Sequence, residues 1–476
     1  MANPISAPVT GADPIAVRLD RLPITRTHRR ATTAVGLGLF FEFYEVFLAG
    51  VLSSVLVEQF SLTKSELTPL LASTFVGMFL GALLLGRVAD RFGRRGAFLI
   101  NLGLYAVFSF VGAFSVGPVM LLITRFFAGI GLGAEPPLAD TYLTDLLPAR
   151  KRGRFIAIAY TLAFCGVPAV GFLARGLTQQ TFLGIAGWRW LFVIGAVGAG
   201  LVFLLRRGLP ESPRWLASVG RRAEAEQVVS AIEAEAGQIA PDQPTPAQQP
   251  AAAVTRTKAA PVSALFGPQH RRRTGMMVLF HILQTVGYYG FGTMVPLVLA
   301  AKGYPVSTSL LFTAMTFVGY PVGSALSLPL VERFERKHLV TGSVLVMAVF
   351  GIAFGYSSSM VLIVVFGFLY TATSNVFSNA YHIYQAEIFP TALRSTAASG
   401  TYSLSRLATA AMPFVLVPLL NHAGPTTLFV VVAAALVVVA ADIGILGPRT
   451  TGVALDAAPE PMAASQPTRA TQPAHD

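Results

Sequence analysis

Two glutamates, Glu42 and Glu45, stand inside the first long apolar run of the chain, which covers residues 32–57. Their spacing of three places both side chains on one face of a helix. Because an ionised carboxylate in apolar surroundings is costly, two neighbouring ones can take up and release a proton near neutral pH. The pair is our candidate for proton chemistry. The alternative is structural, with one glutamate neutralising Arg125 or Arg406.

Three more charges interrupt other apolar runs, namely Arg125, Glu135 and Arg406. Arg125 could balance Glu42 or Glu45, and Glu135 could titrate as a third acid or face water at a helix end. We assign Glu42, Glu45, Arg125 and Glu135 to proton coupling. Arg406 presents planar donors that suit a carboxylate, so it is a candidate for substrate binding. Its alternative is an ion pair with an acid elsewhere in the fold.

Uncharged polar side chains gather in the runs 274–300 and 359–386. Such groups can orient a small polar or aromatic molecule in a largely apolar pocket, although single ones often only pack. The candidates for substrate binding are His281, Gln284, Tyr288, Tyr289, Asn375 and Asn379. The seven histidines show no metal-ligand spacing with carboxylates, so we expect no metal, no cofactor and no enzyme.

These residues must be held by membrane-spanning helices. The chain is 54% hydrophobic and only 12% charged, against roughly 25% charged residues in soluble domains. Runs of about 20 apolar residues can cross a bilayer. Six are predicted before a polar stretch, at 32–57, 67–86, 97–115, 118–146, 155–175 and 187–206. Six more follow, at 274–300, 308–330, 338–356, 359–386, 395–420 and 425–446.

Two motifs recur at one offset of 242 positions. Residues Asp90 to Arg95 reappear as Glu332 to Lys337, and Tyr142, Asp145, Pro148 and Arg152 reappear as Tyr384, Glu387, Pro390 and Arg394. One shared offset indicates that a whole half was duplicated. Two related bundles of membrane helices are typical of transporters. The counterparts of Glu45, Arg125 and Arg406 are Gly287, Gly367 and Phe164, so the repeated scaffold does not explain these charges.

The net charge of +12 is explained by topology. Most of the 35 lysines and arginines fall in segments that face one side if the N-terminus is cytoplasmic, which fits the positive-inside rule with both termini inside. No nucleic-acid partner is therefore expected. The lone Cys165 excludes a disulfide, and the first apolar run is too long for a signal peptide.

The loop GRVADRFGRR at Gly86 to Arg95 resembles the signature of the major facilitator superfamily. Three further stretches are similar to its sugar-porter and metabolite:proton symporter branches: RFFAGIGLGAEPP with YLTDLLPARKRG, LPESPRWL and EIFPTALR. The resemblance implies an all-α integral membrane fold of twelve transmembrane helices in two pseudo-symmetric six-helix bundles. It also supports the acidic pair Glu42 and Glu45 and a coupling or binding role for Arg125.

The same resemblance implies a gate at the cytoplasmic rim. Carboxylates and arginines at helix ends would latch the two bundles together when the protein faces outward. Each exposed pair contributes about 0 to 1 kcal/mol, which suits a reversible latch. The alternative is simple topology and helix capping. The expected gate residues are Asp90, Arg91, Arg95, Asp145, Arg152, Glu211, Arg214, Glu332, Arg333, Glu387 and Arg394.

We therefore expect a proton-coupled symporter that imports a small organic metabolite, a carboxylate or aromatic acid, by alternating access. The alternatives are sugar or polyol symport, drug or metabolite efflux by antiport, and a non-transporting membrane sensor. The partners would be substrate, protons and lipid, and a monomer should suffice. Short outer loops and the lack of Asn-X-Ser/Thr acceptors fit a bacterial cytoplasmic (inner) membrane.

The expected organisation has five parts. They are a cytoplasmic tail (1–30), an N-terminal six-helix bundle (31–206), a cytoplasmic linker with a short helix and a disordered segment (207–273), a C-terminal six-helix bundle (274–447) and a disordered cytoplasmic tail (448–476).

Overall fold

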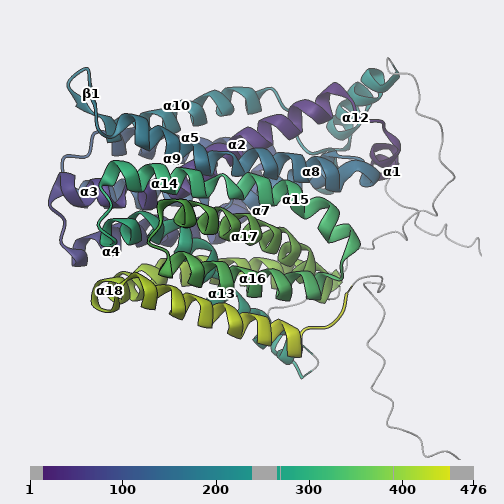
Figure 1. The fold of residues 1–476 in the computed structure, drawn as a ribbon. Coiled ribbons are helices and arrows are strands. Elements are labelled where there is room, and N and C mark those ends of the chain that lie inside the picture. The colour runs from purple at the N-terminus through teal and green to yellow at the C-terminus, as the bar shows by residue number, and fades with distance from the viewer. Residues whose placement is uncertain (1–13, 238–264, 269, 390, 451–476) are drawn as a thin grey trace, which may run out of the picture.

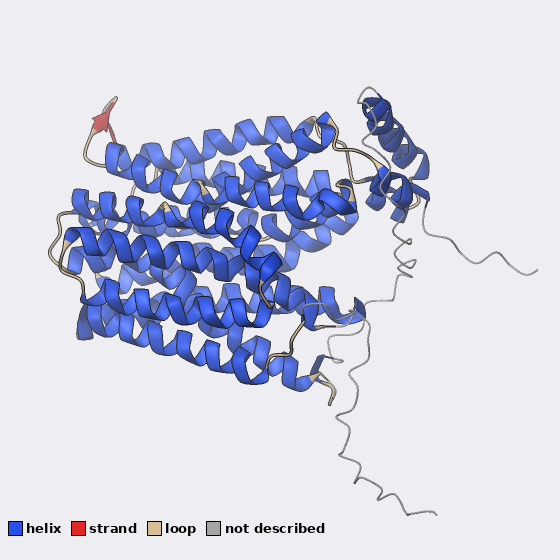
Figure 2. Cartoon of the chain, turned by 45° about the vertical axis from the view of Figure 1, so that its right-hand side comes forward, coloured by secondary structure: helices blue, strands red, loops and turns tan. Residues whose placement is uncertain are grey.

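The computed structural model describes residues 14–237, 265–268, 270–389 and 391–450, and nearly all of them are helical (Figure 1). The exception in Figure 2 is a short hairpin in which β1 (Thr181–Phe182) pairs antiparallel with β2 (Ile185–Ala186). This confirms the predicted all-α class.

The first half contains six transmembrane passes, three of them interrupted. One break lies ahead of Pro136 and Pro137, and another ahead of Pro168, because a proline cannot donate the backbone hydrogen bond that continues a helix. The helices are α2 (Arg26–Val51), α3 (Ser53–Phe60), α4 (Lys64–Phe92), α5 (Arg94–Ala113), α6 (Pro118–Leu132), α7 (Glu135–Leu146), α8 (Ala149–Phe164), α9 (Gly166–Leu177) and α10 (Gly187–Arg207).

The second half repeats this plan with α13 (Arg271–Ala301), α14 (Val306–Phe317), α15 (Gly319–Arg333), α16 (Arg336–Tyr356), α17 (Met360–Ile388) and α18 (Thr391–Leu446). Eleven stretches of the described residues are long and apolar enough to cross a membrane. The last of these holds two helices, because α18 bends where Gly424 takes a φ of 79°. The two final predicted spans, 395–420 and 425–446, thus correspond to two helices that meet at Gly424.

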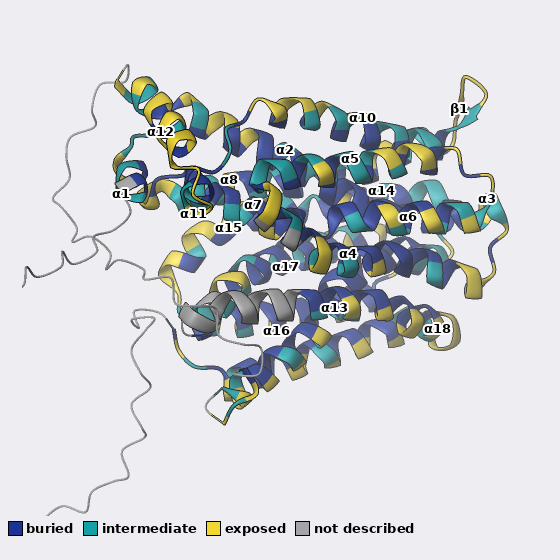
Figure 3. Cartoon of the chain, turned by 180° about the vertical axis from the view of Figure 1, so that it is seen from behind, coloured by how far each residue is buried: buried dark blue, intermediate teal, exposed yellow. Residues whose placement is uncertain are grey.

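Three short helices lie together at one end of the molecule (Figures 1 and 3). They are α1 (Pro14–Arg21), α11 (Pro213–Ser218) and α12 (Arg222–Gly237). The buried side chains of Ile15 and Leu19 face those of α12, and Arg18 forms two hydrogen bonds with Glu233, at 2.8 and 2.7 Å. α1 therefore packs against α12, a helix that lies within the expected linker 207–273.

Figure 3 shows which parts of the helices are buried and which are exposed. Large apolar side chains such as Leu84, Val107 and Val349 are exposed, whereas Glu45, Arg125 and Glu135 are buried. Exposed apolar side chains suit lipid contact, and buried charges then need partners inside the protein. These charges define where a functional site is to be sought.

The two halves pack against each other through α2 with α13, α4 with α18, α8 with α15 and α9 with α14. Near the hairpin end, Ser54 donates a hydrogen bond of 3.5 Å to the carbonyl of Pro296. The position of a Cβ on Gly50 would lie 3.0 Å from the Cα of Thr293, so α2 and α13 approach closely there.

Candidate functional site

Arg125 and Glu45 form an ion pair inside the first half. The Arg125 Nη1 donates to Glu45 Oε2 at 2.6 Å, and its Nη2 donates to Ser109 Oγ at 2.6 Å. The Ser109 hydroxyl in turn donates to Glu45 Oε1 at 2.6 Å. Both charged side chains are essentially buried, at 1% and 0% exposure. The structure thus pairs two predicted coupling residues and adds Ser109, which the sequence analysis did not single out.

A second buried ion pair joins Glu135, the first residue of α7, to Arg206 near the end of α10. Arg206 also donates to the carbonyls of Ala34 and Val35 at 3.2 and 3.1 Å, and its guanidinium lies 4.1 Å from the centre of the Phe98 ring. Arg206 ends the predicted span 187–206, and its side chain is buried. It lies inside the bundle because Glu135 supplies its counter-charge there.

Glu42 differs from both of these acids. It is 1% exposed, and its Oε2 has no hydrogen-bond partner among the residues that the structure describes. The charged groups that act on it are Glu135, Arg406, Arg206 and Asp140. Although Glu42 and Glu45 are three residues apart on α2, only Glu45 has an arginine in direct contact.

Arg406 of α18 contacts Tyr289 of α13. Its Nη1 donates to Tyr289 Oη at 2.6 Å, and the guanidinium lies 5.0 Å from the centre of the same ring. The adjacent Tyr288 donates to Asn375 Oδ1 at 3.1 Å, and Asn375 donates to the carbonyl of Tyr320 at 2.5 Å. Three residues predicted to bind substrate therefore lie close to one another and to Arg406. They are Tyr288, Tyr289 and Asn375.

Aromatic rings from both halves meet at this place. The Phe47 ring lies 6.4 Å from that of Tyr289 and 5.5 Å from that of Tyr320, and the Phe75 ring lies 5.6 Å from that of Tyr289. Phe164 stacks on Tyr320 at 6.4 Å. Phe47, Phe75 and Phe164 come from the first half, and the tyrosines from the second. We call this group the interface aromatic cluster: Phe47, Phe75, Phe164, Tyr288, Tyr289 and Tyr320.

The other predicted substrate residues have different partners. His281 hydrogen-bonds Gln385 at 3.0 Å, and Asn379 donates to Ser327 at 2.7 Å. Gln284 is buried on α13. His281 and Asn379 are therefore engaged by residues of the second half and not by the interface aromatic cluster.

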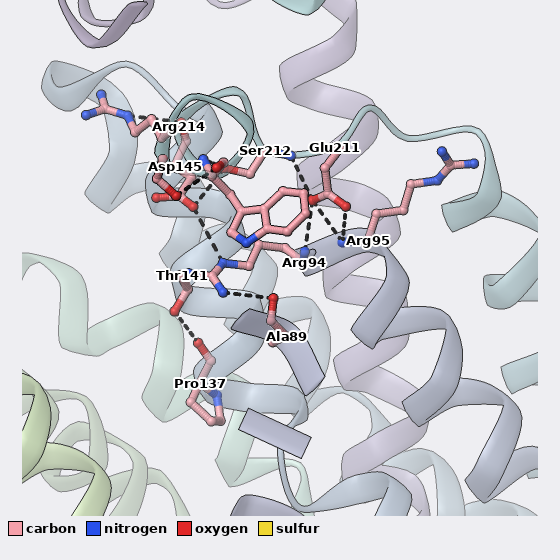
Figure 4. Close-up of polar contacts among 11 residues, drawn as sticks. Ala89, Arg94, Arg95, Pro137, Thr141, Asp145, Glu211, Ser212 and Arg214 are labelled. Atoms are coloured by element: carbon pink, nitrogen blue, oxygen red, sulfur yellow. Dashed lines mark hydrogen bonds and ion pairs between the residues drawn. The ribbon is translucent and has the colours of Figure 1, made fainter. Parts of the chain in front are cut away.

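The predicted gate lies at the end that carries α11 and α12 (Figure 4). Arg94 Nε is 3.9 Å from Asp145 Oδ2, and Ser212 donates to the same carboxylate oxygen at 2.8 Å. The second half repeats the pair, with Arg336 Nε at 3.7 Å from Glu387 Oε1. Neither Arg94 nor Arg336 was among the expected gate residues, although each lies in the motif that the two halves share.

Further gate residues join elements of the first half. Glu211 accepts from the backbone N–H groups of Arg94 and Arg95 at 2.9 and 3.1 Å, and thereby holds the start of α5. Asp20 of α1 lies 2.9 Å from Arg214 and 3.6 Å from Arg152. Arg91, Glu332 and Arg333 are exposed. The side chains of Asp90 and Arg394 lie outside those that the structure describes.

Residues 31–461 match the model of the family described as "Sugar (and other) transporter". The chain is 32% identical over 391 residues to the putative metabolite transport protein YyaJ of Bacillus subtilis, covering 82% of this chain and 86% of that protein. It is 30% identical over 440 residues to the niacin transporter NiaP of Acinetobacter baylyi, with 92% and 98% covered.

The fold resembles that of the xylose transporter XylE from Escherichia coli in a partially occluded, inward-open conformation. The TM-score is 0.73 at 22% identity, over 90% of this chain and 99% of that one. The duplicated halves and the buried charges of this chain are consistent with these relatives, which are membrane transporters. The chain belongs to the sugar (and other) transporter family and is a multi-pass membrane transporter with the major facilitator fold.

Proposed function

We propose that this protein imports a small aromatic carboxylate together with protons by alternating access. The observation that carries the proposal is Arg406, a buried guanidinium that hydrogen-bonds Tyr289 at the interface of the two halves. The planar donors of a guanidinium suit a carboxylate, and such charge-assisted hydrogen bonds are strong away from water. A substrate carboxylate could bind there.

The surroundings of Arg406 favour a flat substrate. Aromatic side chains pair by stacking or edge contacts at ring separations of about 4.5 to 7 Å. The interface aromatic cluster offers such faces from both halves, so an aromatic acid could direct its carboxylate to Arg406 and its ring to Phe47 or Tyr289. That a relative with 30% identity is named a niacin transporter supports an aromatic acid, since niacin is one.

Proton coupling would use the acids of the first half. Glu45 has Arg125 and Glu135 has Arg206, whereas Glu42 has no arginine in direct contact among the described residues. Buried acids near a substrate site can change protonation as that site is filled. The two halves would then rock about the interface, with the pairs Arg94–Asp145 and Arg336–Glu387 exchanging partners at the gate.

We further propose that the tails, the linker and both chain termini face the cytoplasm of a bacterium. The arginine-rich end that carries α1, α11 and α12 would then lie inside, as the positive-inside rule requires. A single copy of the chain would suffice for transport, since both halves of the site belong to it.

Sugar symport is the second candidate. Tyr288 and Asn375 are neutral hydrogen-bonding groups that could orient hydroxyls, and one relative, 26% identical, is an arabinose-proton symporter. A neutral sugar would make no use of the Arg406 charge. The two candidates therefore differ in their response to Arg406→Gln.

Uptake into proteoliposomes tests the proposal. An inward proton gradient should drive uphill accumulation of labelled nicotinate or benzoate, and Arg406→Gln should abolish it. Arg175→Gln is the matched control, since Arg175 ends α9 away from the interface aromatic cluster. If a sugar accumulates instead, and does so regardless of Arg406, the carboxylate assignment is wrong.

A further inference from the structure

One face of α5 carries polar residues at every fourth position. Asn101, Tyr105 and Ser109 all have 0% exposure. A spacing of four places them above one another along the helix. We call these three residues the α5 stripe. No part of the proposed substrate site or of the gate accounts for them.

The α5 stripe runs from one buried ion pair to the other. At one end, Ser109 bonds both partners of the Glu45–Arg125 pair. At the other end, the Asn101 amide lies beside the carboxyl group of Glu135, the partner of Arg206. Tyr105 lies between them, and the charged groups that act on its hydroxyl are Glu135, Arg206, Glu45 and Glu42. The stripe thus contacts an acid of each ion pair, Glu45 and Glu135, and Tyr105 lies within the electrostatic reach of Glu42.

Several buried polar atoms along this line have no hydrogen-bond partner among the described residues. They are the hydroxyl of Tyr105, the Oε2 of Glu42 and the Nε of Arg125. Buried polar atoms are rarely left unsatisfied, and ordered water is their usual partner when protein groups do not serve. Three such atoms in one region indicate a short chain of water molecules.

We infer that the α5 stripe is a proton path inside the first half, which delivers protons through ordered water to Glu42. This inference rests on the proton coupling proposed above and adds its route. A proton from water at the hairpin end would pass along the stripe and bind a Glu42 carboxylate oxygen, leaving that carboxyl neutral. Release toward the opposite end would restore the carboxylate and return the proton to water.

Glu42 is the acid suited to carry the proton. The charged groups facing it are Glu135 and Asp140 of α7, Arg206 of α10 and Arg406 of α18, two acids and two arginines from three elements. Arg206 directly contacts Glu135, and a substrate anion bound at Arg406 would compete with Glu42 for the charge of Arg406. A carboxylate bound at Arg406 would favour protonated Glu42. Proton and substrate would thus take separate routes and meet at this residue.

Tyr105→Phe tests the path because it removes only the hydroxyl. Tyr44→Phe is the matched control, since the Tyr44 hydroxyl is also buried in the first half but donates to the carbonyl of Leu191, off the stripe. In proteoliposomes, Tyr105→Phe should lose proton-driven uphill accumulation of nicotinate and retain exchange of labelled for unlabelled nicotinate. Tyr44→Phe should retain both. Uphill accumulation equal to wild type, or loss of exchange as well, would overturn the inference.

A measurement without substrate keeps this result apart from the substrate assignment. Infrared difference spectra over a pH titration report the carbonyl band of a protonated carboxyl group. Glu42→Gln should remove one buried-carboxyl band, Tyr105→Phe should shift it, and Tyr44→Phe should leave it in place. The proton path is wrong if Tyr105→Phe leaves this band unchanged, or if no Glu42 band is seen at any pH. Either result would hold even if nicotinate is transported. If Tyr105→Phe does not fold, Asn101→Leu interrupts the same stripe.

Discussion

Gly81 and Gly323 make the same contact in the two halves of the molecule. A Cβ on Gly81 would lie 2.1 Å from the carbonyl oxygen of Ile130, and a Cβ on Gly323 would lie 2.0 Å from that of Ala372. Both the glycines and their contacts are separated by the duplication offset of 242 positions. Small residues allow close helix approach in membranes. The two halves therefore share one close contact, which lies between α4 and α6 in the first half and between α15 and α17 in the second.

Gly81→Ala and Gly323→Ala should each destabilise the protein by about 1 to 3 kcal/mol. The added methyl group would clash with backbone atoms, which cannot move aside as a flexible side chain can. Thermal unfolding of the purified protein in detergent measures the effect. Gly200→Ala is the control, since no atom lies within 4 Å of its Cβ position. Equal melting temperatures for all three variants would mean that an added methyl group causes no strain at these close contacts.

Breaking the Glu135–Arg206 pair should be costly. Both side chains are buried, so Glu135→Gln or Arg206→Gln leaves one uncompensated charge and should cost about 3 to 5 kcal/mol. The double variant Glu135→Leu with Arg206→Leu should recover much of that loss. Arg207→Gln, next in sequence but exposed, should change little. If the double variant lost as much stability as the two single variants together, the pairing would be contradicted.

Glu211 should stabilise the start of α5. Its carboxylate accepts from the first two N–H groups of that helix, where a negative charge also meets the positive helix end. Glu211→Ala should cost about 1 to 2 kcal/mol, as loss of a cap does. Hydrogen exchange should rise in the first turn of α5 and stay unchanged in its last turn.

Acid should release α1 from α12. The hydrogen bonds from Arg18 lower the pKa of the Glu233 carboxyl below its ordinary value of about 4.3. The contact therefore contributes in full above that ordinary pKa and is lost as the pH falls through the lower, folded-state pKa. A fluorophore on α1 should report undocking in that acidic range.

The control for this pH dependence is Glu224. The pKa of its carboxyl is also lowered, by a hydrogen bond from Arg221, but neither residue belongs to α1. Glu224→Gln should leave the undocking curve unchanged, whereas Glu233→Gln should release α1 at neutral pH. An undocking curve that Glu233→Gln does not alter would assign the transition to another group.

The sequence predicts the helices well because long apolar runs and a repeated motif leave few alternatives. It also indicates that Arg125 needs an acid in the membrane. The sequence does not show whether Glu42 or Glu45 pairs with Arg125, because that depends on how α2 is rotated relative to α5 and α6. The same limit applies to Arg94 and Arg336, which pair with Asp145 and Glu387 but were not among the expected gate residues.

Arg206 shows a second limit. Two consecutive arginines end α10, and nothing in the sequence tells that Arg206 turns inward while Arg207 faces out. The room for Arg206 comes from Gly38 on another helix, where a Cβ would lie 1.8 Å from its Nη2. Such a fit between distant residues becomes visible only once the helices are assembled.

Ser54 and Pro296 occupy equivalent positions of the two halves, 242 residues apart, and yet they hydrogen-bond each other. Gly50 and its equivalent Gly292 are likewise neighbours, with the Cβ position of the first 3.6 Å from the carbonyl oxygen of the second. A residue that touches its own counterpart lies on the two-fold axis of a symmetric pair. The contact between α2 and α13 therefore has the form of a homodimer interface, now enclosed within one chain.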